Sequence, residues 1–270
     1  TFKISTDAIR NTSLRMRIVG DYADDLSACG NRSYGEVEDY TVIITDPIET
    51  ATIWNGTSWS SEPTNTKEAI VRGVLALTTN LSVKKLTVES GSVTVKSGSV
   101  LKVENEIINN LVADKFVVED GGSIIQTNAT ANTGNVTVLK NSTPMVFNDA
   151  TLWASPVDGQ NVRSFSANTL DKRFYIYTES TDKFASLFIN DALYPNTSLQ
   201  NPSTYNFVQG LGYHIRVANN HTQTEPGAIY EGKFVGKLNN GNYNQAVTKQ
   251  KSGYNLVGNP YPSAINATSF

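Results

Sequence analysis

The sequence contains few of the residues from which catalytic and metal centres are built. Its 270 residues include one cysteine, Cys29, and two histidines, His214 and His221. One cysteine excludes a disulfide framework within the chain, and no histidine lies near it to activate a catalytic thiol. The histidines are 7 residues apart, which matches no zinc-ligand spacing. We therefore expect no metal ligand, no cofactor and no cysteine nucleophile.

Charged residues are also scarce. Asp, Glu, Lys and Arg make up 17% of the chain, below the roughly 25% of ordinary soluble domains. The net charge is −3 and no basic cluster occurs, so nucleic acid is not an expected partner. The apolar runs are far shorter than the roughly 20 residues that cross a bilayer. We therefore expect no transmembrane segment.

Threonine, serine, asparagine and valine are abundant instead, and these residues suit pleated strands and polar turns. Long segments with a 3.6-residue apolar period are missing. The weak helical candidates are residues 5–10 and 262–270. The sequence therefore predicts an all-β chain with almost no α-helix. It lacks a signal peptide and begins in mid-strand, so we interpret it as a segment of a longer protein.

The hexapeptide Gly-Glu-Val-Glu-Asp-Tyr at 35–40 is the most informative motif. With the alternating stretch at 14–19 and Cys29, it resembles the C-terminal half of a GEVED domain, a β-sandwich module of secreted Bacteroidetes proteins. The resemblance covers residues 1–46 and implies an exported, modular protein at the extracellular or outer-membrane surface. It also implies a disulfide partner for Cys29 upstream of Thr1. The alternative is that Cys29 is a small buried hydrophobic residue.

A boundary is expected after this segment, because Pro47 forces an extended backbone on the residue before it. Residues 47–50 are interpreted as a linker. Beyond it, Trp54 and Trp59 flank the turn dipeptide Asn55-Gly56, which predicts a tight hairpin. Two roles fit this hairpin: it covers the end of the next module's core, or its indoles form a platform for sugar.

Residues 51–145 are predicted to form a short β-solenoid. Apolar-polar-apolar triplets alternate with Ser-Gly and Gly-Gly turns, and strands this short fit the flat faces of a solenoid. Asparagines at 105, 109 and 110 fall at expected corners or ladders. A compact sandwich with short strands is the alternative. Lys84, Lys96 and Lys102 should be exposed. The residues predicted to face one continuous core are Leu86, Val88, Val93, Val95, Leu101, Val103, Phe116 and Val118.

Residues 146–270 are predicted to form a second antiparallel β-sandwich-like module, because longer aromatic strands alternate with Gly, Asn and Pro clusters. Residues 133–138 fit a last strand before it. The blocks at 151–160, 210–217 and 254–265 are similar to blocks of a module in large exported flavobacterial proteins. This resemblance covers 51–270 and implies export by the type IX secretion system. It also implies that the module at 146–270 is incomplete at the C-terminus.

No constellation of catalytic residues is found. Gly210-Leu211-Gly212 lacks the third glycine of a dinucleotide fingerprint, and no nucleophile elbow or carboxylate pair occurs. Acidic residues near the start offer the only plausible calcium site, although their spacing matches no EF-hand loop. Cross-strand hydrogen bonds and ion pairs are the alternative for them. They are Asp21, Asp24, Asp25, Glu36, Glu38 and Asp39.

The sequence therefore favours a non-enzymatic segment of a secreted or cell-surface modular protein, an adhesin-like scaffold or stalk. Its expected partners are the type IX secretion machinery during export, and surface glycans or other cell-surface proteins. One alternative is a carbohydrate-binding accessory region of a secreted hydrolase. Another is a structural subunit of an assembly at the outer membrane.

Overall fold

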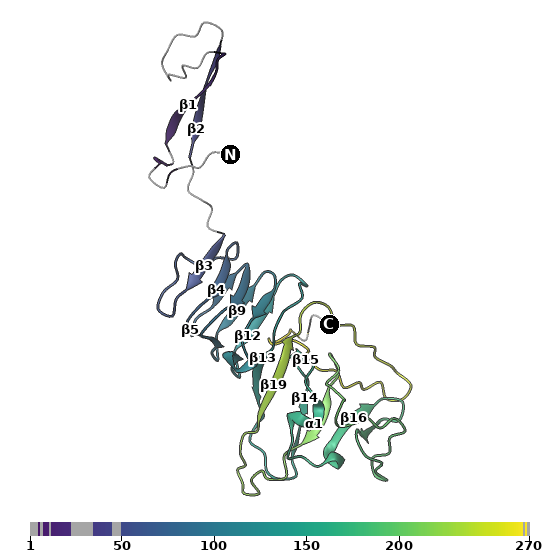
Figure 1. The fold of residues 1–270 in the computed structure, drawn as a ribbon. Helices are drawn as coiled ribbons and strands as arrows, with labels where there is room; N and C mark the ends of the chain where they lie inside the picture. Colours follow the sequence, from purple (N-terminus) through teal and green to yellow (C-terminus); the bar gives the residue numbers. More distant parts are fainter. Residues whose placement is uncertain are drawn as a thin grey trace. The chain divides into compact units, whose positions relative to one another are not determined.

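The computed structural model describes residues 5, 8–10, 12–22, 35–44, 50–266 and 268. The chain divides into two compact units, Thr1–Glu49 and Thr50–Phe270, and each is described by itself (Figure 1). Within the described residues, no helix is long and apolar enough to cross a membrane. Residues 8–10 and 262–266, which belong to the two helical candidates, form no helix. Among the described residues, helical structure is limited to one short α-helix and two 3-10 turns, α1 (Val162–Phe165), η1 (Ala113–Lys115) and η2 (Asp171–Arg173), and to Thr268, whose backbone is also 3-10. The all-β prediction is confirmed.

The first unit contains an antiparallel two-stranded sheet formed by β1 (Ser13–Gly20) and β2 (Glu36–Ile43). Its register places Arg17 directly opposite Asp39. The guanidinium Nε donates to one carboxylate oxygen at 2.7 Å and Nη2 to the other at 2.8 Å. Opposite charges facing each other across a sheet stabilise their pairing. The predictions for Cys29 and for the linker at Pro47 lie outside the described residues.

The second unit begins with a parallel β-solenoid of about four turns, built from three sheets. After its first strand, the chain passes through the three sheets in order, so strands from successive turns stack in register (Figure 1). The first sheet consists of β3 (Ala51–Trp54), β4 (Glu68–Val71), β7 (Lys85–Val88) and β10 (Ile107–Asn109). The second contains β5 (Val74–Leu77), β8 (Ser92–Val95), β11 (Phe116–Val118) and β13 (Val136–Asn141). The third contains β6 (Leu81–Val83), β9 (Val100–Val103) and β12 (Ser123–Gln126).

The solenoid core has the composition that the triplets predicted. All eight residues expected to face inward have 0% of their surface exposed, which confirms the predicted alternation. Lys84 and Lys102 are exposed as expected. Lys96, which was also predicted to be exposed, is only partly exposed, and its ammonium pairs at 2.6 Å with Glu119 on the next turn. Along these strands, side chains therefore alternate between a buried interior and the outer surface.

The corners of the solenoid depend on glycine and asparagine. Gly91 has a φ of +78°, and a Cβ there would lie 2.3 Å from the backbone of Gly73, so no larger residue fits. The buried Asn109 donates from its amide to the Asn135 carbonyl at 2.7 Å. Asn128 donates to the Asn105 side chain of the preceding turn at 2.9 Å. Two of the three asparagines named from the sequence, Asn105 and Asn109, thus bond adjacent turns.

The last solenoid strand joins the turns to an antiparallel module. β13 pairs in parallel with β11 on one side and antiparallel with β19 (Glu231–Leu238) on the other. β19 in turn pairs with β15 (Val157–Asp158), and the result is one continuous six-stranded sheet (Figure 1). The module adds a four-stranded sheet in the order β14–β18–β16–β17, with bounds Ala150–Trp153, Tyr213–Arg216, Phe174–Thr178 and Lys183–Ser186. An antiparallel module after the solenoid was predicted and is confirmed.

An aromatic cluster fills the space beside β19. The Phe234 ring stacks on Phe165 with a centroid distance of 4.4 Å and meets Trp153 and Phe207 edge-on. At Gly232 a Cβ would lie 2.6 Å from the Trp153 ring, so the missing side chain lets that ring pack against the strand. Phe234, Phe165 and Trp153 belong to the same contiguous apolar core as the solenoid interior. The solenoid and the antiparallel module therefore share one core.

The three sequence blocks that carry the resemblance meet in this module. β14 from the first block pairs with β18 from the second. Leu211 of the second block forms an antiparallel bridge with Val257 of the third. The third block also reaches the solenoid, because the Ile124 amide of β12 donates to the Pro262 carbonyl at 3.0 Å. This bond covers part of an otherwise open strand edge.

Candidate functional site

The hairpin at Trp54 and Trp59 is the site to which sequence reasoning gave most weight. The two residues form an antiparallel bridge, and their ring centroids lie 5.4 Å apart. The turn between them is held by the Asn55 side-chain oxygen, which accepts hydrogen bonds from the amides of Thr57 and Ser58, both at 2.9 Å. Gly56 has a φ of +105°, which glycine tolerates. The Asn-Gly dipeptide thus forms the predicted tight turn.

Both indoles contact the first solenoid turn. The Trp54 Nε1 donates to the Val74 carbonyl at 2.9 Å. Val74 begins β5, which is the edge strand of its sheet, so this bond satisfies a backbone acceptor at the end of the solenoid. The two indoles also pack against the solenoid core while remaining partly exposed. These are the contacts of an end cap.

The same hairpin forms one wall of an open groove of about 610 Å³. Its floor includes the buried side chains of Leu75, Leu77 and Leu81. Its polar lining residues include Glu62, Asn65 and Asn80. Aromatic faces next to carboxylate and amide groups provide the two kinds of contact that sugar rings use, stacking and hydrogen bonding. We call this feature the Trp54–Trp59 groove.

The acidic residues near the start do not gather into a metal site in the part of the chain that the structure describes. The Asp39 carboxylate pairs with Arg17, and the hydrogen bond from the guanidinium lowers its pKa below the usual value. Glu38 accepts a hydrogen bond from the Tyr40 hydroxyl. These two contacts are an ion pair across the strands and a bond between neighbours on one strand face. Asp24 and Asp25 lie outside the described residues.

The two histidines occupy separate environments. His214, on β18, packs between the Tyr175 and Phe184 rings at centroid distances of 5.4 and 4.7 Å, and burial lowers its pKa. The His221 Nε2 lies 3.0 Å from the Ala228 carbonyl in a loop. In the structure, His214 therefore packs between aromatic rings and His221 bonds across a loop. Gly212 lies against Leu256, where a Cβ would come within 2.7 Å of the leucine side chain.

Glu179 is a structurally important carboxylate that sequence reasoning missed. It follows β16 and accepts hydrogen bonds from the amides of Gln250, Lys251 and Gly253 at 2.9, 2.7 and 3.1 Å. The Thr248 hydroxyl adds a fourth bond at 2.8 Å. Backbone hydrogen bonds, above all that from Gln250, lower its pKa to about 2. This carboxylate holds the irregular segment 248–253, and no local sequence pattern links residues about 70 positions apart.

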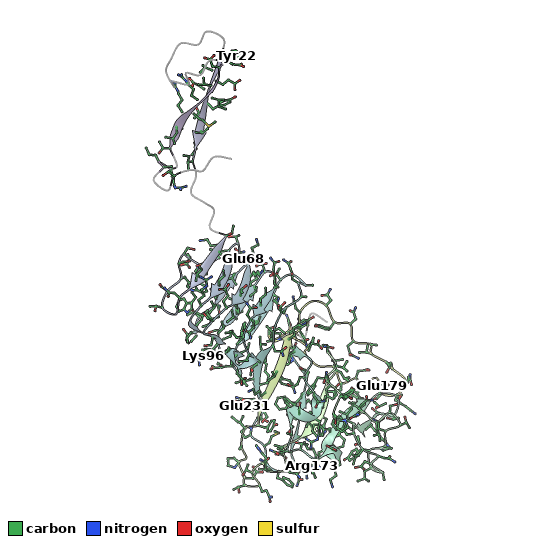
Figure 2. All side chains as sticks on the ribbon, in the orientation of Figure 1. Tyr22, Glu68, Lys96, Arg173, Glu179 and Glu231 are labelled. Carbon is green, nitrogen blue, oxygen red and sulfur yellow. The ribbon has the colours of Figure 1, made fainter. Side chains whose placement is uncertain are left out.

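Replacing Glu179 with glutamine should release this segment, because a neutral amide oxygen is a weaker acceptor than a carboxylate. Lys249 and Lys251 lie in the segment, so trypsin at neutral pH should cut Glu179→Gln there faster than the parent protein. The exposed Glu231, at the start of β19 (Figure 2), gives the control Glu231→Gln. Equal cleavage rates in the two variants would contradict the role assigned to Glu179.

The depressed pKa also predicts a pH dependence. The folded pKa of Glu179 is about 2, whereas the pKa of a glutamate in an unfolded chain is about 4.3. The stabilisation is therefore fully present above the unfolded pKa and is lost as the pH falls through about 2. Amide chemical shifts of Gln250, Lys251 and Gly253 should follow one titration with that midpoint. A midpoint near the ordinary glutamate value would show that the bonds do not persist in solution.

The geometry of the second unit defines a class of protein: a parallel β-solenoid of about four turns joined through a shared sheet to the antiparallel module of β14 to β19, which we call the aromatic module. The family model described as "Domain of unknown function (DUF8693)" matches residues 49–270, and the chain belongs to this family. A model of the GEVED domain matches residues 1–43. Comparison with curated proteins and with solved structures finds no match for the chain.

Proposed function

We propose that this chain is a non-catalytic scaffold segment of a modular protein at the extracellular or outer-membrane surface. The observation that carries the proposal is the continuous six-stranded sheet from β5 to β15, which joins the solenoid to the aromatic module. A shared sheet and a shared core allow the second unit to act as one stiff spacer. The GEVED match at residues 1–43 adds a further module to the same chain, as a modular surface protein requires.

Export by the type IX secretion system is part of this proposal, and it depends on the resemblance of the blocks at 151–160, 210–217 and 254–265 to exported flavobacterial proteins. The test is direct. In a host that expresses the full-length gene product, surface-labelled cells should display the chain, and inactivation of the secretion system should retain it inside. Unchanged display after inactivation would contradict this route.

The non-catalytic role has its own test. Purified chain incubated with polysaccharide and peptide libraries should release no product. The stiff-spacer interpretation has a separate test, in which calorimetry should show the second unit unfolding in one transition. Turnover of any of these substrates by the purified chain would overturn the proposal. Two separate transitions within residues 50–270 would contradict the stiff-spacer interpretation.

A second candidate function is glycan binding, which the Trp54–Trp59 groove favours. The groove combines two partly exposed indoles with polar residues at Glu62 and Asn65, both of which are exposed. Glycan arrays probed with the full chain should show binding that Glu62→Ala and Asn65→Ala weaken without changing the unfolding temperature. These substitutions leave the capping indoles in place, so the loss cannot be attributed to an uncovered solenoid end. Equal binding by both variants and the parent protein would contradict this function.

A further inference from the structure

Lys140 stands at a position where the strand pattern calls for an apolar residue. On β13, Val136 and Val138 face the core and are at most 2% exposed. Lys140 is the next residue on that face, because side chains alternate along a strand. It lies directly opposite Gly232 of β19, where the Trp153 ring packs against the strand in place of a side chain. The lysine side chain therefore enters the junction between the solenoid and the aromatic module.

The junction contains an open cavity of about 550 Å³, a volume typical of small-molecule sites. We call it the junction cavity. Lys140 lines it, together with apolar side chains from two of the three sequence blocks. These apolar lining residues include Leu152, Trp153, Pro156, Leu256 and Val257. Asn141 and Asn259 also line it and supply amide groups. The cavity thus combines an extended apolar surface with a single cation.

The charge of Lys140 is not balanced by an ion pair in the part of the chain that the structure describes. Several other solenoid lysines form ion pairs, as Lys85 does with Glu106 at 2.9 Å and Lys96 with Glu119 at 2.6 Å. Among the described residues, Lys140 forms neither an ion pair nor a side-chain hydrogen bond. Burial lowers its pKa, and the charge of Asp120, which forms no ion pair with it, acts in the opposite direction. An ammonium group that is partly desolvated and unpaired is costly, so an anion bound beside it would be stabilised.

We propose that the junction cavity binds a small amphiphilic carboxylic acid, whose carboxylate pairs with Lys140 and whose apolar body lies against Trp153 and Leu256. The cation fixes the sign of the ligand's charge. The apolar lining determines that the rest of the ligand is apolar, because most of the other surface that lines the cavity is hydrocarbon. The site is separate from the Trp54–Trp59 groove, since the two cavities share no lining residue. The proposal therefore stands independently of glycan binding.

Calorimetric titration of the full chain tests the proposal with two acid–amide pairs, octanoate with octanamide and 3-phenylpropionate with 3-phenylpropanamide. Each pair keeps the apolar body and removes the charge. At least one acid should bind saturably and more tightly than its amide by about tenfold, the difference that a hydrogen bond to a charged group makes. Failure of both acids to bind saturably, or equal affinity of each acid and its amide, would overturn the proposal.

Substitution of the lysine locates the site. Lys140→Met keeps the length of the side chain and removes its charge, so the preference for the acid should disappear while the folded protein persists. Lys140→Arg should retain the preference. Lys102→Met, at an exposed solenoid lysine, is the matched control and should bind like the parent protein. If Lys140→Met does not fold, Lys140→Gln serves the same purpose. A preference that survives loss of the charge at residue 140 would overturn the proposal.

Discussion

Replacing Phe116 with alanine should lower the free energy of unfolding of the second unit by about 3–5 kcal/mol. Phe116 on β11 is fully buried in the middle of the solenoid. Its strand pairs with β8 on the preceding turn and β13 on the next, so the flanking turns cannot collapse into the space that the ring vacates. The lost transfer free energy and the residual cavity therefore add. Urea denaturation followed by circular dichroism measures the change.

A second solenoid residue and an exposed neighbour complete this experiment. Leu101→Ala removes a fully buried side chain on β9 and should cost about 2–5 kcal/mol. Ile125→Ala is the control, because Ile125 on β12 points outward and is 44% exposed; its cost should stay below about 1 kcal/mol. If Leu101→Ala and Phe116→Ala both left the midpoint unchanged, the inward assignment of the solenoid strands would be wrong.

Phe234→Ala should have an effect of similar size, about 3–5 kcal/mol, although Phe234 belongs to the aromatic module. Its ring is fully buried, stacks on Phe165 and touches Trp153. It also lies directly opposite Val138 of the last solenoid strand. Because the solenoid and the aromatic module share this sheet and core, the whole second unit should unfold in one transition. Phe234→Ala should lower the temperature of that transition, as Phe116→Ala does.

The readout for Phe234→Ala is the shape of the unfolding curve as well as its midpoint. Differential scanning calorimetry should show one peak at a lower temperature, with no part of the second unit melting separately. Tyr254→Ala removes an aromatic ring that is 73% exposed and provides the control; its peak should stay close to that of the parent protein. If the aromatic module of this variant unfolded first, and the solenoid then unfolded at the same temperature as in the parent protein, the stabilities of the two parts would not be coupled through the junction.

The strand pattern of the solenoid could be predicted because it is local. In triplets such as Leu86-Thr87-Val88, the alternation of side chains fixes which residues face inward once a strand forms. The Asn-Gly turn between Trp54 and Trp59 was predictable for the same reason, since turn geometry depends on adjacent residues. Local patterns do not predict which contacts a hairpin makes with the rest of the protein. The bond from Trp54 to Val74, and hence the capping contact, needed the structure.

The candidate sites depend on residues that lie far apart in the sequence. In the sequence, Lys140 has the pattern of an ordinary strand lysine. Only the pairing of β19 with β13, which places Gly232 opposite it, shows its environment. In the sequence, Glu179 has the pattern of a turn residue. Only the structure shows that the segment at 248–253 donates hydrogen bonds to it. No periodic sequence pattern predicts either environment, because each one depends on which distant segments come together.

The sequence by itself determined the all-β class, the alternation of the solenoid strands and the chain's separation into a GEVED-like start and a longer second part. Only the tertiary structure decided that the solenoid and the aromatic module form one sheet and one core, and that Lys140 enters a cavity between them. The physical reason is that side-chain direction and turn conformation are set by neighbouring residues, whereas strand pairing over long distances is set by the complementarity of edges and apolar faces. That complementarity must outweigh the entropy of closing long loops, and it becomes visible only when the whole chain has folded.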